Sequence, residues 1–418
     1  MHFCKQLITA FFLFVSVSSL AAQDNWPEFR GPTGDGVAPA ISLPTDLGDQ
    51  ANISWEIPIH GRGWSSPVIW GKQIWLTSAT EDGKKMFGIC VDLKTGRLIY
   101  DKLIYENESP RFRHATNSYA SCTPAIEAGR VYLHFGSYGT TCLDTETGET
   151  IWNRRDFECD HFRGPGSSPI LYGDNLIVAY DGSDKQYVVA LDKKTGKTAW
   201  KTDRNLDYGT DNGDWKKAYG TASVFQIEGK PTLIYPSAKA TVAYNPINGE
   251  PLWTVYHDGM NASARPILTE DGLVILTNGM GRMDAVKPHG TGDITETNID
   301  WTITKNVTRR PSPILVSGNL FMFNDKGIAS CVRAKDGEIL WQKRIGGTFA
   351  ASPIFDGEHI FAFGEKGEIF AFQPGDSYKV IEETHLGDGF KASPAVAGNS
   401  LIIRSISKLY CLNGNLRN

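Results

Sequence analysis

The sequence predicts an all-β fold, an eight-bladed β-propeller of four-stranded antiparallel blades. The first observation is an opening motif of the Ser-Pro type, which returns roughly every 40–57 residues. The second is a turn glycine followed four residues later by an aromatic residue, which occurs five times. Such a period is typical of propeller blades rather than of helical solenoids. The predicted blades start near Pro67, Pro124, Pro169, Ser223, Pro266, Pro313, Pro353 and Pro394.

The clearest single copy of the repeat lies between residues 167 and 200. Three β-prone runs, at 170–172, 176–180 and 187–191, are separated by turns rich in Gly, Asp and Asn. The pair Thr195-Gly196 then closes a tight turn, because glycine takes the positive φ that hairpin turns need. Four strands with one hydrophobic face are not stable alone, so each unit requires neighbouring copies.

The turn glycine and its aromatic partner keep the same spacing along the chain. The five pairs are Gly96 with Tyr100, Gly148 with Trp152, Gly196 with Trp200, Gly249 with Trp253, and Gly337 with Trp341. A lone strand at 53–57 carries a further tryptophan, Trp55, but has no three strands before it. The fragment 391–412 offers an opening motif and three strands, but no fourth. We therefore expect the N-terminal strand to complete the last blade and close the ring, which leaves no open edge.

The chain divides into three predicted segments. Residues 1–22 resemble a signal peptide, with Lys5, an apolar run and a small-residue cleavage site. Residues 23–52 read as an ordered N-terminal strap, and residues 53–418 as a single propeller. The apolar run is short for a membrane span, although an uncleaved anchor remains the alternative, and no later stretch is long enough to cross. Cys4 precedes the run, so we expect an exported, unlipidated protein that is periplasmic or secreted.

Composition excludes one class of partner. The chain of 418 residues carries a formal net charge of −5, whereas nucleic-acid binding relies on a basic surface. The length exceeds what one hydrophobic core usually serves, about 250–300 residues. A ring of blades avoids that limit, because each blade packs only on its neighbours.

The repeat resembles a known family. The segment 190–200, ALDKKTGKTAW, has the pattern Ala/Cys-x-Asp-x-x-Thr-Gly-x-x-x-Trp, which is similar to the repeat of the pyrroloquinoline-quinone-like (PQQ-like) propellers. The opening at 26–36, WPEFRGPTGDG, is similar to exported members of that family. The resemblance implies that the repeated aromatic residues and glycines dock neighbouring blades, at Trp55, Tyr100, Trp152, Trp200, Trp253 and Trp341 and at Gly96, Gly148, Gly196, Gly249 and Gly337.

Two branches of this family differ in function. Quinoprotein dehydrogenases hold the quinone and a calcium ion in the central funnel, often against an adjacent Cys-Cys pair that this chain lacks. They also carry long insertions between blades, whereas the blades here are nearly minimal. The other branch is the non-enzymatic lipoprotein scaffold of the β-barrel assembly machinery, whose lipid-acceptor site this chain also lacks.

We therefore expect a non-enzymatic binding or scaffolding module, with cell-envelope protein assembly as one role, that uses no cofactor. One alternative is an alcohol or sugar dehydrogenase dependent on PQQ and calcium, and another is a binder of an anionic glycan. The expected partners are an envelope or secreted protein, or an anionic small molecule or glycan, and not nucleic acid.

Basic residues precede the innermost strands of seven of the eight predicted blades. In a propeller these segments surround one mouth of the central channel, where converging cations attract an anion. The alternative is that they pair with nearby carboxylates such as Asp160, Asp214, Asp258 and Asp388. The candidate ligand-binding residues are Arg62, Arg113, His114, His161, Arg163, Lys217, Arg265, Arg309, Arg310 and Lys391.

Two further features are weaker signals. Asp203, Asn205 and Asp207 alternate as calcium ligands do, but Gly209 stands at the seventh position of this loop where a calcium loop needs glycine at the sixth. A solvated inter-blade loop is the competing interpretation. Four cysteines occupy the same third-strand position in different blades, which predicts small buried core residues rather than disulfides. They are Cys90, Cys142, Cys331 and Cys411.

Overall fold

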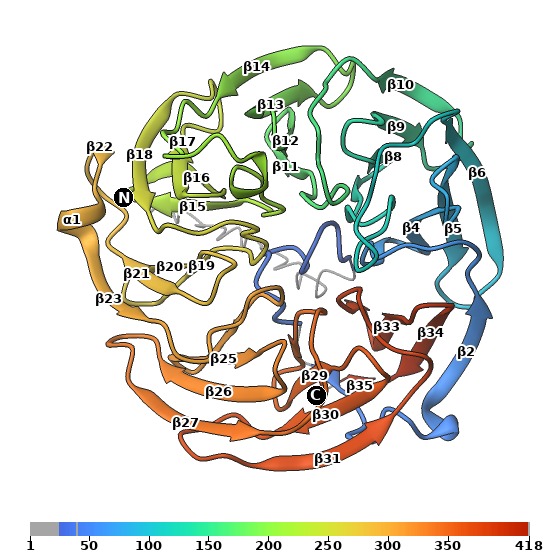
Figure 1. Ribbon diagram of the computed structural model, residues 1–418. Helices are drawn as coiled ribbons and strands as arrows, with labels where there is room; N and C mark the ends of the chain where they lie inside the picture. Colours follow the sequence, from blue (N-terminus) through green and yellow to red (C-terminus); the bar gives the residue numbers. More distant parts are fainter. Residues whose placement is uncertain (1–24, 39–40, 417–418) are drawn as a thin grey trace, which may run out of the picture.

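Eight antiparallel sheets surround a central axis in the computed structural model, which describes residues 25–38 and 41–416 (Figure 1). Each blade has the four antiparallel strands that the repeat predicts, and the fourth blade adds a short parallel strand, so the eight-bladed propeller is confirmed. The predicted signal peptide, 1–22, lies outside the described residues. Within the described ranges, no helix has the length and apolar character needed to span a membrane.

The two inner strands of each blade lie nearest the axis. The innermost strands are β3 (Val68–Trp70), β7 (Ala125–Glu127), β11 (Ile170–Tyr172), β15 (Ser223–Ile227), β19 (Ile267–Leu268), β24 (Ile314–Val316), β28 (Ile354–Phe355) and β32 (Ala395–Ala397). The second strands are β4 (Gln73–Ala79), β8 (Arg130–His134), β12 (Asn175–Asp181), β16 (Lys230–Pro236), β20 (Val274–Thr277), β25 (Asn319–Phe323), β29 (Ile360–Phe363) and β33 (Ser400–Arg404).

The two outer strands complete each blade. The third strands are β5 (Lys85–Asp92), β9 (Thr140–Asp144), β13 (Gln186–Asp192), β17 (Ala240–Tyr244), β21 (Met283–Val286), β26 (Ile328–Arg333), β30 (Glu368–Phe372) and β34 (Lys408–Asn413). The outermost strands are β6 (Leu98–Glu106), β10 (Thr150–Arg154), β14 (Thr198–Asp203), β18 (Pro251–Tyr256), β23 (Ile299–Ile303), β27 (Ile339–Arg344), β31 (Val380–His385) and β2 (Ile53–Pro58).

Burial follows the position of a strand within its blade. The second and third strands are sandwiched between neighbouring blades, so almost every residue of β12 and β13 is buried. Their sequences are correspondingly runs of Val, Ile, Leu, Ala and Tyr rather than alternating patterns. The outermost strand β14 has only Trp200 buried, and its other side chains are exposed or half-buried. The hydrophobic core therefore lies between the blades.

Strand β2 closes the ring, as the sequence predicts. It pairs antiparallel with β34, and Trp55 stands opposite Cys411. The first described strand of the propeller thus completes the sheet formed by the last three (Figure 1). A few short elements add to the four-strand repeat. They are the paired strands β1 (Ile41–Ser42) and β35 (Asn415–Leu416), the strand β22 (Gly292–Asp293), the helix α1 (Thr295–Asn298), and the 3-10 turns η1 (Gln50–Asn52) and η2 (Gly213–Trp215).

The repeated tryptophans pack on glycines of the next blade. The ring of Trp152 lies so close to Gly196 that a Cβ there would stand 2.7 Å from it, and its indole N–H donates to the carbonyl of Lys193 at 3.0 Å. The same contact with the following blade's glycine is made by Trp55 with Gly96, Tyr100 with Gly148, Trp200 with Gly249, and Trp301 with Gly337. Trp341 donates to the carbonyl of Gly375 at 3.2 Å, while Trp253 is buried against β22.

The N-terminal strap crosses one end of the channel (Figure 1). Trp26 is buried and pairs through its backbone with Ile69 of the first blade. Further along, Ala38 donates to Phe355 of the seventh blade at 2.8 Å. The buried Arg30 donates to the carbonyl of Pro313 at 2.8 Å. The strap is thus anchored on several blades at once.

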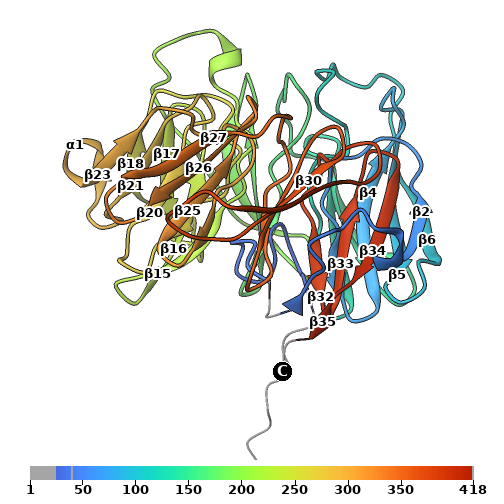
Figure 2. The same ribbon diagram turned by 90° about the horizontal axis from the view of Figure 1, so that it is seen from below.

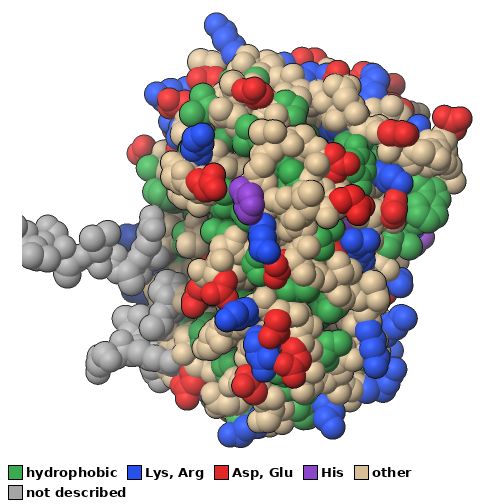
Figure 3. Space-filling view, turned by 90° about the vertical axis from the view of Figure 1, so that its left-hand side faces the viewer, with side chains coloured by type: hydrophobic (Ala, Val, Ile, Leu, Met, Phe, Trp, Pro, Cys, Tyr) green, Lys and Arg blue, Asp and Glu red, His purple; other side chains and the backbone are tan. Residues whose placement is uncertain are grey.

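The side of the ring shown in Figure 3 has no large patch of a single charge sign. Figure 3 shows acidic and basic side chains interspersed over the side formed by blades four and five. The six cysteines among the described residues are buried and free: Cys90, Cys122, Cys142, Cys159, Cys331 and Cys411.

Candidate functional site

A ring of hydroxyl groups surrounds the channel and explains the Ser-Pro motif. The backbone N–H of the residue before each proline donates a hydrogen bond to a hydroxyl of the next blade. Proline itself has no N–H and cannot donate this bond. The bonds measure 2.9–3.1 Å and run from Ser66 to Thr123, Thr123 to Ser168, Ser168 to Thr221, Arg265 to Ser312, Ser312 to Ser352, Ser352 to Ser393, and Ser393 to Ser66.

Above this ring the channel opens into a cavity of about 380 Å³. Strand direction alternates within a blade, so the inter-blade loops and the turns between second and third strands share this face. Figure 2 shows the longer loops rising on the side opposite the strap. Phe29 of the strap lines the cavity from its inner end. Trp64, Met280 and six hydroxyl side chains of the ring also line it.

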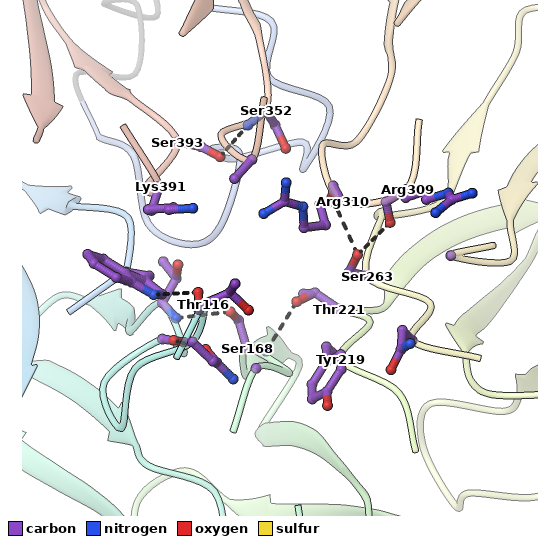
Figure 4. A pocket seen from close by; sticks show the side chains of 18 of the residues that line it. Thr116, Ser168, Tyr219, Thr221, Ser263, Arg309, Arg310, Ser352, Lys391 and Ser393 are labelled. Carbon is purple, nitrogen blue, oxygen red and sulfur yellow. Dashed lines mark hydrogen bonds between the residues drawn. The ribbon is translucent and has the colours of Figure 1, made fainter. Parts of the chain in front are cut away.

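Four of the predicted cations line the cavity. They are Arg163, Arg309, Arg310 and Lys391. Figure 4 shows Arg310 and Lys391 pointing toward each other across the cavity, whereas Arg309 points away from its centre. The hydroxyl of Ser263 donates to the carbonyl of Arg309 at 3.0 Å and holds this corner of the loop in place.

Carboxylates neutralise only half of the charge at the mouth. Six of the predicted cations stand in pairs, and each pair shares one carboxylate: Arg62 and Arg113 share Glu81, Arg163 and Lys217 share Asp214, and Arg310 and Lys391 share Glu365. The two bonds to Glu81 are both 2.6 Å. These six cations therefore keep three positive charges that the three shared carboxylates do not neutralise.

The pKa values follow from burial and from this sharing. Burial alone would raise the pKa of Glu81, but hydrogen bonds from Arg113 and Arg62 outweigh it and hold the pKa below its usual range. The pKa of Asp214 is lowered in the same way by Lys217 and Arg163, against the effect of burial. Burial lowers the pKa of Lys391, although its hydrogen bond to a carboxylate acts in the opposite direction.

Three other predicted site residues lie elsewhere. Arg265 faces the strap, where it pairs with Glu28 at 2.6 Å. His161 is buried and accepts the N–H of Ser137 at 3.0 Å, and burial lowers its pKa to about 4. His114 contacts the hydroxyl of Thr116 at 2.8 Å on the rim. The cavity therefore contains only some of the candidate ligand-binding residues, and these three stabilise the strap or the loops instead.

Sequence reasoning missed three of the carboxylates. Asp214 is one of the acids considered as a partner, whereas Glu81, Asp325 and Glu365 are not. These three share a detectable signal, because each stands in the turn between the second and third strands of its blade. Asp160 and Asp388 instead accept backbone N–H groups, and Asp258 pairs with Lys239.

The calcium candidates do not converge. Asp203 pairs with Lys201 at 2.7 Å, and Asp207 accepts the N–H of Gly209 at 2.8 Å. Across residues 25–38 and 41–416, no group of three or more His, Cys, Asp or Glu is arranged to hold a metal. In the cavity the carboxylates are already bound to cations. This donor set suits an anion rather than a calcium ion.

Three exposed aromatic side chains lie on three successive inter-blade loops, on one side of the mouth. Phe112 is 67% exposed and lies edge-on to Phe162, with ring centroids 6.3 Å apart. Phe162 precedes the cavity residue Arg163 and is itself 40% exposed. Trp215 is 43% exposed and follows Asp214. Large apolar side chains in solvent mark surfaces that bind partners.

Comparison with known proteins agrees with this architecture. A profile of the family described as "Outer membrane protein assembly factor BamB" matches residues 55–214 and 184–415, which together span almost the whole ring. The chain is 25% identical to the assembly factor BamB of Yersinia pestis over 199 residues, which are 45% of this chain and 48% of that protein. It is 23% identical to BamB of Moranella endobia over 256 residues, 59% and 60% of the two chains. The chain thus spans about half the length of the curated relatives it matches.

Solved structures of both family branches share the fold. BamB from Moraxella catarrhalis superposes with a TM-score of 0.61 at 13% identity, covering 86% of this chain and 99% of that one. Quinohemoprotein alcohol dehydrogenase from Comamonas testosteroni gives 0.65 at 12% identity, covering 95% and 81%. At such identities the likeness shows the fold alone. With the profile match over nearly the whole ring, the chain belongs to the PQQ-like propeller family of the outer membrane protein assembly factor BamB.

Proposed function

We propose that this protein is a periplasmic, non-enzymatic binding module that serves outer membrane protein assembly. The observation that carries the proposal is the exposed aromatic rim formed by Phe112, Phe162 and Trp215. Aromatic residues are enriched at protein–protein interfaces, where they supply large contact area at low entropy cost. The named relatives, assembly factors from several bacteria, support the same role.

The dehydrogenase alternative receives less support from the cavity. A quinone enzyme would need oxygen ligands for calcium, whereas the acidic groups at this mouth are bound to arginine and lysine. The fold is common to both branches and does not choose between them. The chemistry of the lining side chains therefore favours binding over oxidation.

Site-specific photo-crosslinking in the periplasm tests this role. A photoreactive residue at position 112 should capture components of the β-barrel assembly machinery. The matched control is Ile247, which is 66% exposed but lies in a turn between third and fourth strands, on the opposite face. Crosslinks to assembly components from 112 and not from 247 are the expected result. Equal capture at both positions, or none at 112, would contradict the proposal.

A further inference from the structure

The cavity at the mouth closes at its inner end. Phe29 of the strap lines it there, and the hydroxyl ring encircles the channel. Its volume of about 380 Å³ lies in the range of small-molecule sites, roughly 300–1,000 Å³. A ligand must therefore enter from the mouth, and only a small molecule or the end of a chain fits.

Its wall carries two cations that share one carboxylate, so one of their two positive charges is not neutralised. Arg310 and Lys391 come from different blades and point toward each other (Figure 4). Both contact Glu365, with Arg310 at 2.7 Å from one carboxylate oxygen and Lys391 on the other. Lys391 is 14% exposed and Glu365 17%, so these two groups are largely shielded from water, whereas Arg310 is 38% exposed. Weak screening strengthens the attraction for a second carboxylate.

Hydrogen-bond donors line the rest of the wall. A hydroxyl that accepts one backbone N–H keeps its own O–H to donate, and six such hydroxyls of the ring line the cavity. Arg163 also lines it, and the Nε of this arginine is buried with no hydrogen-bond partner among the described residues. A buried donor of this kind gains free energy when an acceptor arrives.

Apolar side chains complete the lining. Trp64, Met280 and Pro165 line the cavity beside the polar groups. Arg62 lies over the Trp64 ring, 4.9 Å from its centroid, and fixes that side of the wall. A bare inorganic ion would leave these apolar surfaces unused.

We infer that this cavity binds a carboxylate-bearing organic ligand, with the carboxylate held by Arg310 and Lys391 and a short carbon skeleton against Trp64 and Met280. Planar guanidinium forks match carboxylates well. The carboxylate can belong to a free organic acid or to an acidic peptide end. This inference concerns the cavity itself and does not depend on the assembly role.

Calorimetric titration of the mature protein at constant ionic strength tests the inference. The probes are citrate, succinate, an acetylated Asp-Glu dipeptide and inorganic phosphate. Saturable binding of the carboxylate probes is expected, weakened at least tenfold in Arg310→Gln and Lys391→Gln. Stronger binding of citrate assigns the site to free acids, and stronger binding of the dipeptide assigns it to peptide ends.

Two further variants keep the result unambiguous. Arg97→Gln removes a charge from an exposed turn between a third and a fourth strand, on the face opposite the cavity, and it should bind within twofold of wild type. Glu365→Gln frees both cations, so it should bind the carboxylates at least fivefold more tightly even if a charge-removing variant folds poorly. No carboxylate binding at millimolar concentration, equal loss in Arg97→Gln, or phosphate bound as tightly as citrate would overturn the inference.

Discussion

The backbone N–H of Ser393 donates to the hydroxyl of Ser66 at 3.0 Å, across 327 positions of the chain. This bond joins the last blade to the first and is one of seven such bonds around the channel. Ser66 in turn donates its own N–H to Thr123 at 3.0 Å. One small residue therefore connects three blades, through its hydroxyl and its backbone N–H.

Replacement of Ser66 by alanine should lower stability without changing the fold. The variant leaves the buried N–H of Ser393 without an acceptor, which costs about 1–3 kcal/mol. The expected result is a lower denaturant midpoint with an unchanged circular dichroism spectrum. Ser109→Ala, in an exposed loop, is the control. Equal midpoints for the two variants would show that the ring bond carries little free energy.

Blade docking can be separated from backbone strain with two glycines of the third blade. Gly196 has φ +70°, and an added Cβ would stand 2.7 Å from the Trp152 ring. Gly173 has φ +56° and open space around it. Both alanine variants carry left-handed strain of about 1–2 kcal/mol. Only Gly196→Ala must displace the tryptophan, so it should cost a further 1–3 kcal/mol or so.

Thermal or chemical unfolding measures that difference directly. If Gly196→Ala and Gly173→Ala lose the same free energy, the tryptophan contact contributes nothing beyond strain. A larger loss for Gly196→Ala assigns the difference to docking between blades three and two.

Stability should fall in mild acid because three histidines are buried. Burial lowers the pKa of His134 and of His257 to about 3, and that of His161 to about 4. Unfolding exposes them to water, where the pKa is about 6.5. The unfolded chain then binds more protons, so stability is full above pH 6.5 and declines as pH falls. Each histidine contributes a slope of about 1.4 kcal/mol per pH unit.

Urea unfolding at pH 5.0, 5.5 and 6.0 measures this slope. His161→Gln should reduce it by one proton, since the amide oxygen can still accept the N–H of Ser137. A slope unaffected by His161→Gln would refute the assignment.

The strap should loosen when its contact with Arg265 is disturbed. Gly34 has φ +73°, and a side chain there would collide with the Arg265 guanidinium, which pairs with Glu28. Arg30 is only 2% exposed, so its peptide bond is protected from trypsin in the native protein. Gly34→Ala should speed tryptic cleavage after Arg30 several-fold.

The matched control for the strap is Gly229→Ala. Gly229 has a similar φ, +75°, with nothing within 4 Å of an added Cβ. Its variant should be cleaved after Arg30 at the wild-type rate. Similar rates for both variants would mean that the strap is held by other contacts.

The fold was predictable because the same sequence features recur from blade to blade. The Ser-Pro opening returns roughly every 40–57 residues, and the turn glycine keeps a fixed offset of four residues from its aromatic partner in five copies. The structure places these residues at equivalent points of successive blades. Trp301 escaped prediction because β22 and α1 lie between β21 and β23 and remove the glycine normally found four residues before it. It still packs on Gly337.

The site was predictable only in part because charge pairing depends on three-dimensional neighbours. Basic residues before the inner strands indicated a positive mouth, and four of them line the cavity. Which carboxylate each cation meets could not be read from proximity in sequence: Arg113 and Glu81 stand 32 positions apart. The hydroxyl ring was visible as a motif, but its bonds link residues 40 or more positions apart.

The pairing of β2 with β34 also has a consequence for biogenesis. The earliest strand of the propeller has its partner only after nearly the whole ring has been made. Until then one hydrophobic face of the first blade and the edge of β2 are uncovered, a state that invites aggregation or proteolysis. A chain that ends before β34 cannot complete the last sheet and close the ring. Only chains that contain both β2 and β34 can therefore form the closed propeller, and incomplete chains keep an exposed strand edge.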